Sequence, residues 1–176
     1  GVSIGKSATA GSVIVASKER SARAISTRQP VVQANMNDAA KKLIANSQWL
    51  HVDHVGVKRL EEAGISRGKG PQISFDAGYG VESFDPIVVD LFVPTDRQMA
   101  LRYPGVDLAV ALENDSMKAG NTVVATQGSA GSAGFSPETG LVTAPGFKVD
   151  VMSTLGAGDV FHGALVAQLI QGHPLQ

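Results

Sequence analysis

The sequence predicts an α/β fold, with a mainly parallel sheet and helices on both of its faces, and three observations lead to this prediction. Segments typical of strands alternate with segments typical of helices along most of the chain. Glycine is frequent, with 20 residues, and only 5% of the residues are aromatic, which suits tight turns between strands and helices. The run Thr122–Thr126 is apolar and β-branched, which is typical of a buried strand.

The first 30 residues form a different pattern from the rest. We expect a strand over residues 9–16, a polar turn over 17–20 and a returning strand over 21–26. We interpret residues 1–30 as lid or edge strands and residues 31–176 as the α/β core. Two further strands of the main sheet are the alternative interpretation of this hairpin.

In the core, the expected helices start at capping residues and the expected strands are short apolar runs. We expect helices near 37–44, 57–63, 97–103 and 159–171. We expect strands at 49–55, 72–76, 87–93 and 122–126, and two short strand pieces within 141–151. A glycine-rich loop should cover 127–134. Ligands bind such sheets at the carboxyl ends of the parallel strands, so the connections after these strands are the places to search.

Composition excludes several classes of function. The 15 basic and 16 acidic residues leave a net charge of −1, which argues against a broad electrostatic nucleic-acid surface. No apolar run approaches the ~20 residues of a membrane helix, so we expect no membrane contact. Cysteine is absent, which excludes disulfides, thiolate zinc sites and cysteine nucleophiles from the given residues and fits a cytoplasmic protein.

The segment Ser153–Ala164 carries the chemistry. Its Gly156-Ala157-Gly158 turn leads directly into a helix, where small residues let backbone N–H groups face an anion. Asp159 stands at the same turn and could accept a proton from a hydroxyl while the amides hold phosphoryl oxygens. For an isolated Gly-x-Gly-Asp the simpler interpretation is structural: Asp159 would only cap a helix that follows a glycine turn.

The match extends beyond this tetrapeptide. Thr154 to Phe161 resembles the second signature of the ribokinase-like (PfkB) carbohydrate kinase family, Asp-Thr-x-Gly-Ala-Gly-Asp-x-Phe. Upstream, Thr122 to Gly131 is similar to the strand and Thr-x-Gly-x-x-Gly loop that lies along the nucleotide phosphates in this family. The resemblance continues through 49–55, 73–76 and 90–94, and it implies a ribokinase-like, three-layer Rossmann-like fold.

The resemblance implies ATP-dependent phosphorylation of a sugar or nucleoside hydroxyl, with Mg²⁺ carried by the ATP. Asp159 would be the catalytic base and also contact the substrate, and Gly156, Ala157 and Gly158 would form the anion hole. Asp53, near the end of a strand, is a further candidate for substrate contact, and no residue of the chain is assigned as a metal ligand. The candidate nucleotide-binding residues are Thr95, Thr126, Gly128, Ser129 and Gly131. A homodimer through the lid strands is a further expectation.

The sequence departs from the family pattern in places that bear on activity. Ser153 stands where the signature opens with Asp, and Thr95-Asp96-Arg97-Gln98 replaces Asn-x-x-Glu. His162 stands where Asn is frequent, and we interpret it as structural rather than catalytic. A metal site of His51, Asp53 and His54 is discounted, because residues i and i+3 of a strand face opposite sides.

Two alternatives to an active kinase follow. A ribokinase-like pseudokinase, acting as a binding or scaffold subunit, fits the departures at Ser153 and Thr95–Gln98. A dinucleotide-dependent oxidoreductase would need Gly-x-Gly-x-x-Gly after the first strand, and residues 1–11 lack it. Because the chain starts at Gly1 and the family's sugar-binding Gly and Asn residues are not found, we expect a truncated chain without the amino-terminal half and the carboxyl-terminal end.

Overall fold

The computed structural model describes residues 11–17, 22–28, 36–78 and 83–175, and it contains two compact units. The first unit, residues 1–41, contains the antiparallel pair of β1 (Gly11–Ser17) and β2 (Ala22–Arg28). Their register pairs Gly11 with Arg28 and Ser17 with Ala22. The two expected strands are therefore confirmed, while residues 9–10 and the turn residues 18–21 lie outside the described part of the chain.

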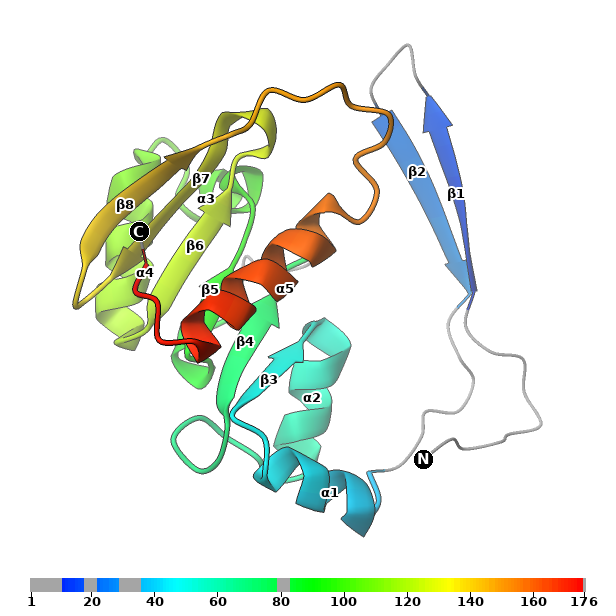
Figure 1. Cartoon of the computed structure of the whole chain (residues 1–176), viewed down its shortest axis with the longest axis vertical. Coiled ribbons are helices and arrows are strands. Elements are labelled where there is room, and N and C mark those ends of the chain that lie inside the picture. The colour runs from blue at the N-terminus through cyan, green and yellow to red at the C-terminus, as the bar shows by residue number, and fades with distance from the viewer. Residues whose placement is uncertain (1–10, 18–21, 29–35, 79–82, 176) are drawn as a thin grey trace. The chain divides into compact units, whose positions relative to one another are not determined.

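The second unit, residues 42–176, is built on a six-stranded sheet in the order β3-β4-β5-β6-β7-β8 (Figure 1). The first four strands pair in parallel: β3 (Trp49–Val52), β4 (Gln72–Asp76), β5 (Leu91–Val93) and β6 (Thr122–Thr126). The last two continue antiparallel as a hairpin: β7 (Gly131–Ser136) and β8 (Gly140–Pro145). The mainly parallel sheet is thus confirmed.

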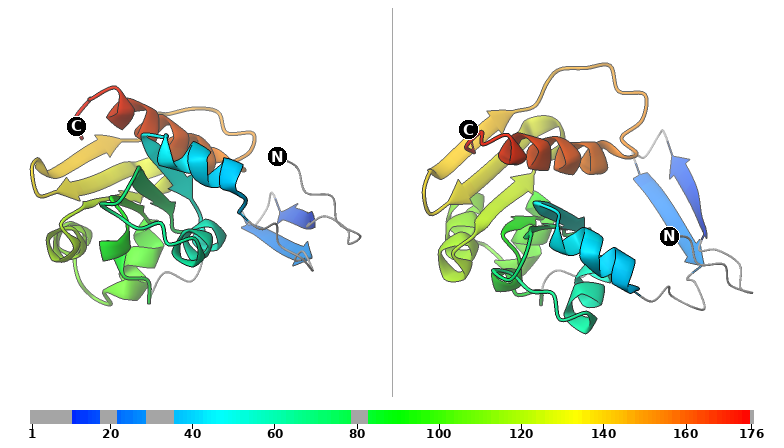
Figure 2. Two further views of the ribbon diagram at one scale, coloured as in Figure 1. Left: turned by 90° about the horizontal axis from the view of Figure 1, so that it is seen from below. Right: turned by 60° about the horizontal axis from the view of Figure 1, so that its bottom comes forward.

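Helices cover both faces of this sheet (Figure 2). On one face lies α5 (Ala157–Ile170), and on the other lie α2 (His54–Glu62), α3 (Asp96–Arg102) and α4 (Leu108–Ala119). The remaining helical segments are α1 (Asp38–Ala45) and the short 3₁₀ turns η1 (Pro86–Val88) and η2 (Gly128–Ala130). None of the helices among the described residues is both long and apolar enough to cross a membrane.

Several elements differ from the sequence prediction. The strand expected to reach residue 55 ends at Val52, because Asp53 accepts hydrogen bonds from two amides and starts α2. The strand expected at 87–93 divides into η1, capped by Asp85, and β5. Among the described residues after Gly146 there is no strand, whereas β7 begins inside the expected glycine loop. Helix α4 was not predicted at all.

The two faces of the sheet bury different side chains, because neighbouring residues of a strand point to opposite sides. Toward α5 lie Leu91, Val93 and Val124, which contact Val166 of that helix. On the other face Phe75, Phe84 and Phe92 pack ring against ring, with centroids 4.3–6.1 Å apart. Residues of β3 and β4 on the α5 side are instead partly polar: His51, Ser74 and Asp76. This polar strip leads to the strand ends described next.

Candidate functional site

The turn before α5 has the conformation that an anion-binding helix start requires. Gly156 adopts φ = 80°, a left-handed conformation that side-chain-bearing residues avoid. The amide of Val160 donates to the carbonyl of Gly156 (3.0 Å), so the helix begins directly after this residue. The first amides of a helix lack acceptors within the helix, and the residues of this first turn, Ala157–Val160, are exposed. The amide of Ala157 donates to the carbonyl of Thr154 (3.3 Å), and the next two first-turn amides, those of Gly158 and Asp159, belong to exposed residues.

Gly158, by contrast, does not have a left-handed backbone. A Cβ atom added there would meet no described atom within 4 Å outside its own helical turn and its chain neighbours. A larger residue at this position would therefore fill open space outside the turn, without straining the backbone. The same holds at Gly163, further along α5.

Asp159 is exposed in the first turn of α5, above the glycine turn. A Cβ on Gly156 would lie 3.8 Å from its Oδ2 oxygen, so the carboxylate leans toward the turn. A carboxylate is also favourable at the positive end of a helix. Burial lowers the pKa of His51 on β3, and the negative charge of Asp159 is one of three carboxylates that oppose this lowering.

His162 of α5 and His51 of β3 lie side by side. Their ring centroids are 5.3 Å apart, and the Nδ1 atom of His51 lies 3.1 Å from the hydroxyl of Ser74. Burial and the neighbouring charge of His162 lower the pKa of His51, against the opposing effect of Asp76, Asp53 and Asp159. The sequence analysis singled out His162 as structural and considered His51 only as a metal ligand. Alternation along β3 and β4 could have placed His51, Ser74 and Asp76 on one face.

Asp53, the candidate substrate residue, follows directly after β3. Its Oδ1 atom accepts from the amides of Val55 (3.0 Å) and Gly56 (2.8 Å). Asp53 is therefore a helix cap, which occupies one carboxylate oxygen and fixes its orientation. Contact with a substrate stays a prediction. Among the described residues no three His, Asp or Glu side chains are grouped so as to hold a metal ion.

Thr95, at the end of β5, takes part in a capping box. Its hydroxyl accepts from the amide of Gln98 (3.2 Å), and its own amide donates to the side-chain oxygen of Gln98 (2.6 Å). Gln98 also donates to the carbonyl of Ala77, which fastens α3 to the end of β4. The carboxylate of Asp96 accepts from the amide of Arg97 (2.7 Å). The segment in place of Asn-x-x-Glu thus forms a helix start, and a role of Thr95 in nucleotide binding stays a prediction.

The loop after β6 brings backbone segments unusually close together. Gly128 has φ = 57° and Gly131 φ = 105°, and a Cβ on Gly131 would collide with the carbonyl oxygen of Ala144. A Cβ on Gly146 would likewise collide with the carbonyl oxygen of Ser129. These glycines are required by the close approach of η2 to the end of β8. Thr126, Gly128 and Ser129 are at least partly accessible, so they remain candidates for contact with a nucleotide.

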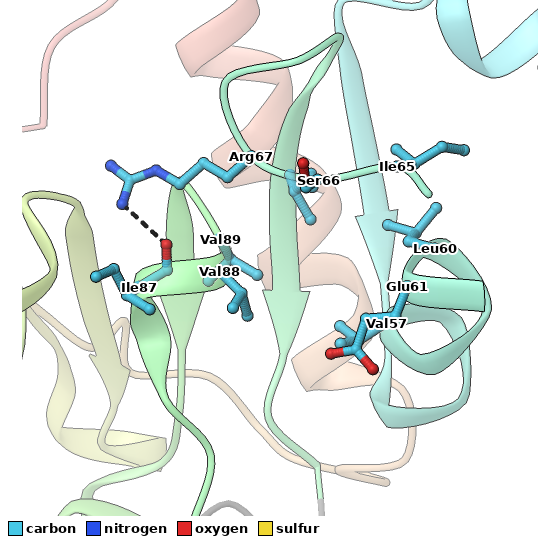
Figure 3. A pocket seen from close by; sticks show the side chains of 10 residues that line it. Val57, Leu60, Glu61, Ile65, Ser66, Arg67, Ile87, Val88 and Val89 are labelled. Atoms are coloured by element: carbon cyan, nitrogen blue, oxygen red, sulfur yellow. Dashed lines mark hydrogen bonds between the residues drawn. The ribbon is translucent and has the colours of Figure 1, made fainter. Parts of the chain in front are cut away.

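A pocket of about 230 Å³ lies toward the amino ends of β4 and β5, away from these residues (Figure 3). Apolar side chains of α2 and η1 line most of it, among them Leu60 and Val88. Its one cationic group, Arg67, donates to the carboxylate of Asp90 (2.9 Å) and to three main-chain carbonyls. Because that guanidinium is fully engaged within the protein, we assign no chemistry to this pocket.

Parallel topology places the predicted site residues at one edge of the sheet. Asp53 follows β3, Thr95 follows β5, and Thr126 ends β6. His162 connects the start of α5 to the same edge, because its Nε2 atom lies 3.4 Å from the carbonyl of Val93 and 3.8 Å from Asp76. The exposed amides and the carboxylate of the α5 turn therefore belong to the carboxyl edge, where ligands bind in such sheets.

Comparisons with known proteins bear on the family and on the fold. A family model described as pfkB family carbohydrate kinase matches residues 87–176, just over half of the chain. The chain also superposes on a ribokinase from Cryptococcus neoformans var. grubii serotype A in complex with ADP (17% identity, 98% of this chain, 63% of that chain, TM-score 0.71).

Two further solved structures are similar. One is Arabidopsis thaliana ribokinase complexed with ribose and ATP (16% identity, 96% of this chain, 59% of that chain, TM-score 0.72). The other is adenosine kinase from Sinorhizobium meliloti (17% identity, 95% of this chain, 56% of that chain, TM-score 0.78). At these identities the likeness establishes the fold, which is ribokinase-like. The chain spans 56–63% of the length of the three proteins.

Proposed function

We propose a function for this chain, which belongs to the pfkB family of carbohydrate kinases. The chain carries the nucleotide-binding and catalytic half-site for phosphorylating a sugar or nucleoside hydroxyl with ATP. The observation that carries the proposal is the turn of Gly156–Gly158, which leads straight into the exposed first turn of α5 with Asp159 on it. This arrangement combines donors for phosphoryl oxygens with a base for the attacking hydroxyl.

In the proposed reaction the amides of Gly156, Ala157 and Gly158 hold the γ-phosphoryl oxygens. Asp159 accepts the proton of the acceptor hydroxyl as that oxygen attacks the γ-phosphorus in line and the bond to ADP breaks. Fixed donors at a helix start need no reorganisation as charge develops, which is why such a turn suits this transfer. Solved relatives complexed with ADP and with ribose and ATP support the substrate classes.

The nucleotide is proposed to lie along the loop after β6, contacting Thr126, Gly128, Ser129 and Gly131, with Thr95 nearby. Exposure of Gly128 and Ser129 supports this, while Gly131 contributes through the close backbone packing that shapes the loop. Mg²⁺ binds phosphates and water readily and keeps few protein ligands, so it would arrive with ATP and neutralise charge on the phosphates. Asp96 offers a partly exposed carboxylate near the strand ends.

A homodimer through β1 and β2 and a cytoplasmic location complete the proposal. Val13 and Val15 of β1 are 67% and 64% exposed, and Ile14 and Ile25 are also accessible. A two-stranded hairpin is marginally stable alone, so apolar side chains on it favour a covering partner. Both statements remain predictions, which gel filtration and cell fractionation would test.

A pseudokinase is the second candidate, and a specific observation favours it. Thr95 and Gln98 form a capping box with each other at positions where relatives often carry Asn and Glu. The hydroxyl oxygen of Ser153 accepts a hydrogen bond from the amide of Leu155 (3.2 Å). Both positions thus serve the backbone. A scaffold subunit would bind nucleotide without turning it over.

One assay separates the two candidates. The natural full-length protein is incubated with Mg²⁺–ATP and a panel of sugars and nucleosides, and ADP release is measured with each acceptor. Acceptor-dependent ADP release that disappears in Asp159→Asn supports the kinase. Nucleotide binding by calorimetry without release for any acceptor supports the pseudokinase.

A further inference from the structure

His162 is the exception in an otherwise open part of α5. Ala157 to Val160 are exposed, with Val160 at 73%, whereas His162 is only 4% exposed. Its imidazole points into the protein toward β4 and β5. A polar ring buried at this position needs hydrogen-bond partners, because an unpaired buried polar group is costly.

Both ring nitrogens of His162 face acceptors. The Nδ1 atom lies 2.7 Å from the carbonyl oxygen of Gly158. The Nε2 atom lies 3.4 Å from the carbonyl oxygen of Val93 and 3.8 Å from the carboxylate of Asp76. A neutral imidazole donates from one nitrogen only, whereas the protonated ring donates from both. The ring of His162 therefore has an acceptor on each side, whichever tautomer it adopts.

These contacts join three elements at one point. Gly158 is in the anion-hole turn, Val93 is the last residue of β5, and Asp76 is the last residue of β4. The carbonyl that accepts from His162 belongs to the peptide bond between Gly158 and Asp159. Holding this carbonyl fixes the direction of the helix start, and thereby the position of the Asp159 carboxylate relative to the strand ends. The ring of His51 covers the outer side of the same contact, 5.3 Å away.

We propose that His162 is a positioning residue for phosphoryl transfer, which fastens the first turn of α5 to the ends of β4 and β5 and thereby aligns Asp159. The inference rests on the proposed function, in which Asp159 is the base. Misplacement of a catalytic group by about 1 Å can lower a rate about 100-fold, so such a link affects turnover more than binding.

The chain offers a matched control for this residue. Val166 is buried to a similar extent, at 8% exposure, one helical turn further along the same stripe of α5. Its contacts are apolar, with Leu91, Val93 and Val124. Val166→Ala therefore disturbs the same helix without removing a hydrogen bond to the strand ends.

The kinetic test compares His162→Leu, His162→Asn and Val166→Ala in the natural full-length protein. We expect His162→Leu to lower kcat at least about tenfold with the KM for ATP changed less than threefold. His162→Asn keeps a donor at the Nδ1 position and should recover part of the loss. Val166→Ala should retain kcat within about twofold despite a lower melting temperature. Wild-type kcat in His162→Leu, or an equal loss in Val166→Ala, would overturn the proposal.

A second measurement separates this inference from the proposed function. Hydrogen exchange of the backbone amides of residues 156–162 is followed in the same three variants, without substrate. We expect faster exchange in His162→Leu than in Val166→Ala, confined to this turn. If the wild-type protein shows no kinase activity, the proposed function fails while the exchange result still decides whether His162 holds the turn. Equal exchange in the two variants contradicts the inference.

Discussion

Polar groups at the amino edge of the parallel sheet are paired within the protein, whereas some of those at the carboxyl edge are left exposed. At the amino edge, Arg67 donates to Asp90 and to the carbonyls of Ile87, Ala119 and Gly120, while Asn121 donates to the carbonyls of Pro86 and Val89. Asp90 accepts in turn from the amide of Ile73 (2.8 Å). These polar side chains form hydrogen bonds within the protein, mostly to its backbone, and their role is structural.

At the carboxyl edge, the turn of Gly156–Gly158 and the Asp159 carboxylate face solvent. His162, one turn further along α5, reaches inward to the ends of β4 and β5. The exposed carboxylate of Asp159 and the amides of the exposed residues Gly158 and Asp159 are available to a ligand. A charged group whose hydrogen bonds are all made within the protein contributes to stability. A charged group left exposed can bind a ligand or take part in a reaction, so the carboxyl edge is the candidate site.

Replacing Asp159, at the carboxyl edge, gives the largest expected effect, which is on the rate of phosphoryl transfer. Asp159→Asn keeps the size of the side chain and removes the proton acceptor, so we expect kcat to fall about 10²–10⁴-fold. ATP affinity should remain within a few-fold of the wild type, because the amides of the turn are unchanged. Steady-state kinetics and calorimetry on the natural full-length protein check both parts. Full activity of the variant would refute the role of Asp159 as base.

Replacing Arg67, at the amino edge, should lower stability and leave nucleotide binding unchanged. Arg67→Met removes a partly buried ion pair and the donors to three carbonyls, so we expect the free energy of unfolding to fall by about 2–3 kcal/mol. Denaturant unfolding of the chain measures this, with the exposed Lys69→Met as control, expected within about 0.5 kcal/mol. Nucleotide affinity should not change. A loss of affinity without a loss of stability would mean that this edge also binds ligand.

His51 gives the smallest effect, a dependence of stability on pH. Its pKa in the folded chain is lowered by burial and by His162, so the unfolded chain binds the proton more readily. The folded state should therefore keep its full stability above the ordinary histidine value near 6.5 and lose part of it as the pH falls through and below that value.

The variant His51→Asn tests this dependence on pH. Thermal unfolding between pH 5 and pH 7.5 should show a smaller loss of stability at low pH in the variant than in the wild type. Because His51 is only partly buried, we expect a modest difference in slope. An identical pH dependence in both proteins would assign the effect to other groups.

The comparison of edges also explains what the sequence could and could not predict. The glycine turn before α5 and the buried strand β6 were predicted because local signals determine them: left-handed glycine at Gly156 and a β-branched run. Helix α4 was missed although Asp107 caps it and Gly120 ends it with φ = 59°. Its buried face includes Asp115 and Ser116, so the apolar periodicity that would mark it is interrupted.

Partners distant in the sequence account for that interruption. Asp115 forms an ion pair with Arg102 (2.7 Å) and accepts from the hydroxyl of Tyr103 (2.6 Å), which makes a carboxylate tolerable in the core. Burial and the neighbouring Asp115 raise the pKa of Tyr103, so it stays a donor. The contacts of His162 with Val93 and Asp76 are of the same kind. Neither set follows from spacing, because each depends on how separate elements pack.

Gly158 provides the most direct test of whether the turn before α5 binds the phosphates of ATP. Gly158→Val places a side chain in the space outside the turn, where the protein itself offers nothing to collide with. Gly163→Val makes the same change within α5, also in open space, and serves as the matched control. ATP binding is measured by calorimetry in the natural full-length protein. We expect Gly158→Val to weaken binding at least about tenfold, and Gly163→Val to leave it within about twofold, with similar melting temperatures. Equal ATP affinity in the two variants would contradict phosphate binding at this turn and leave it a structural start of α5.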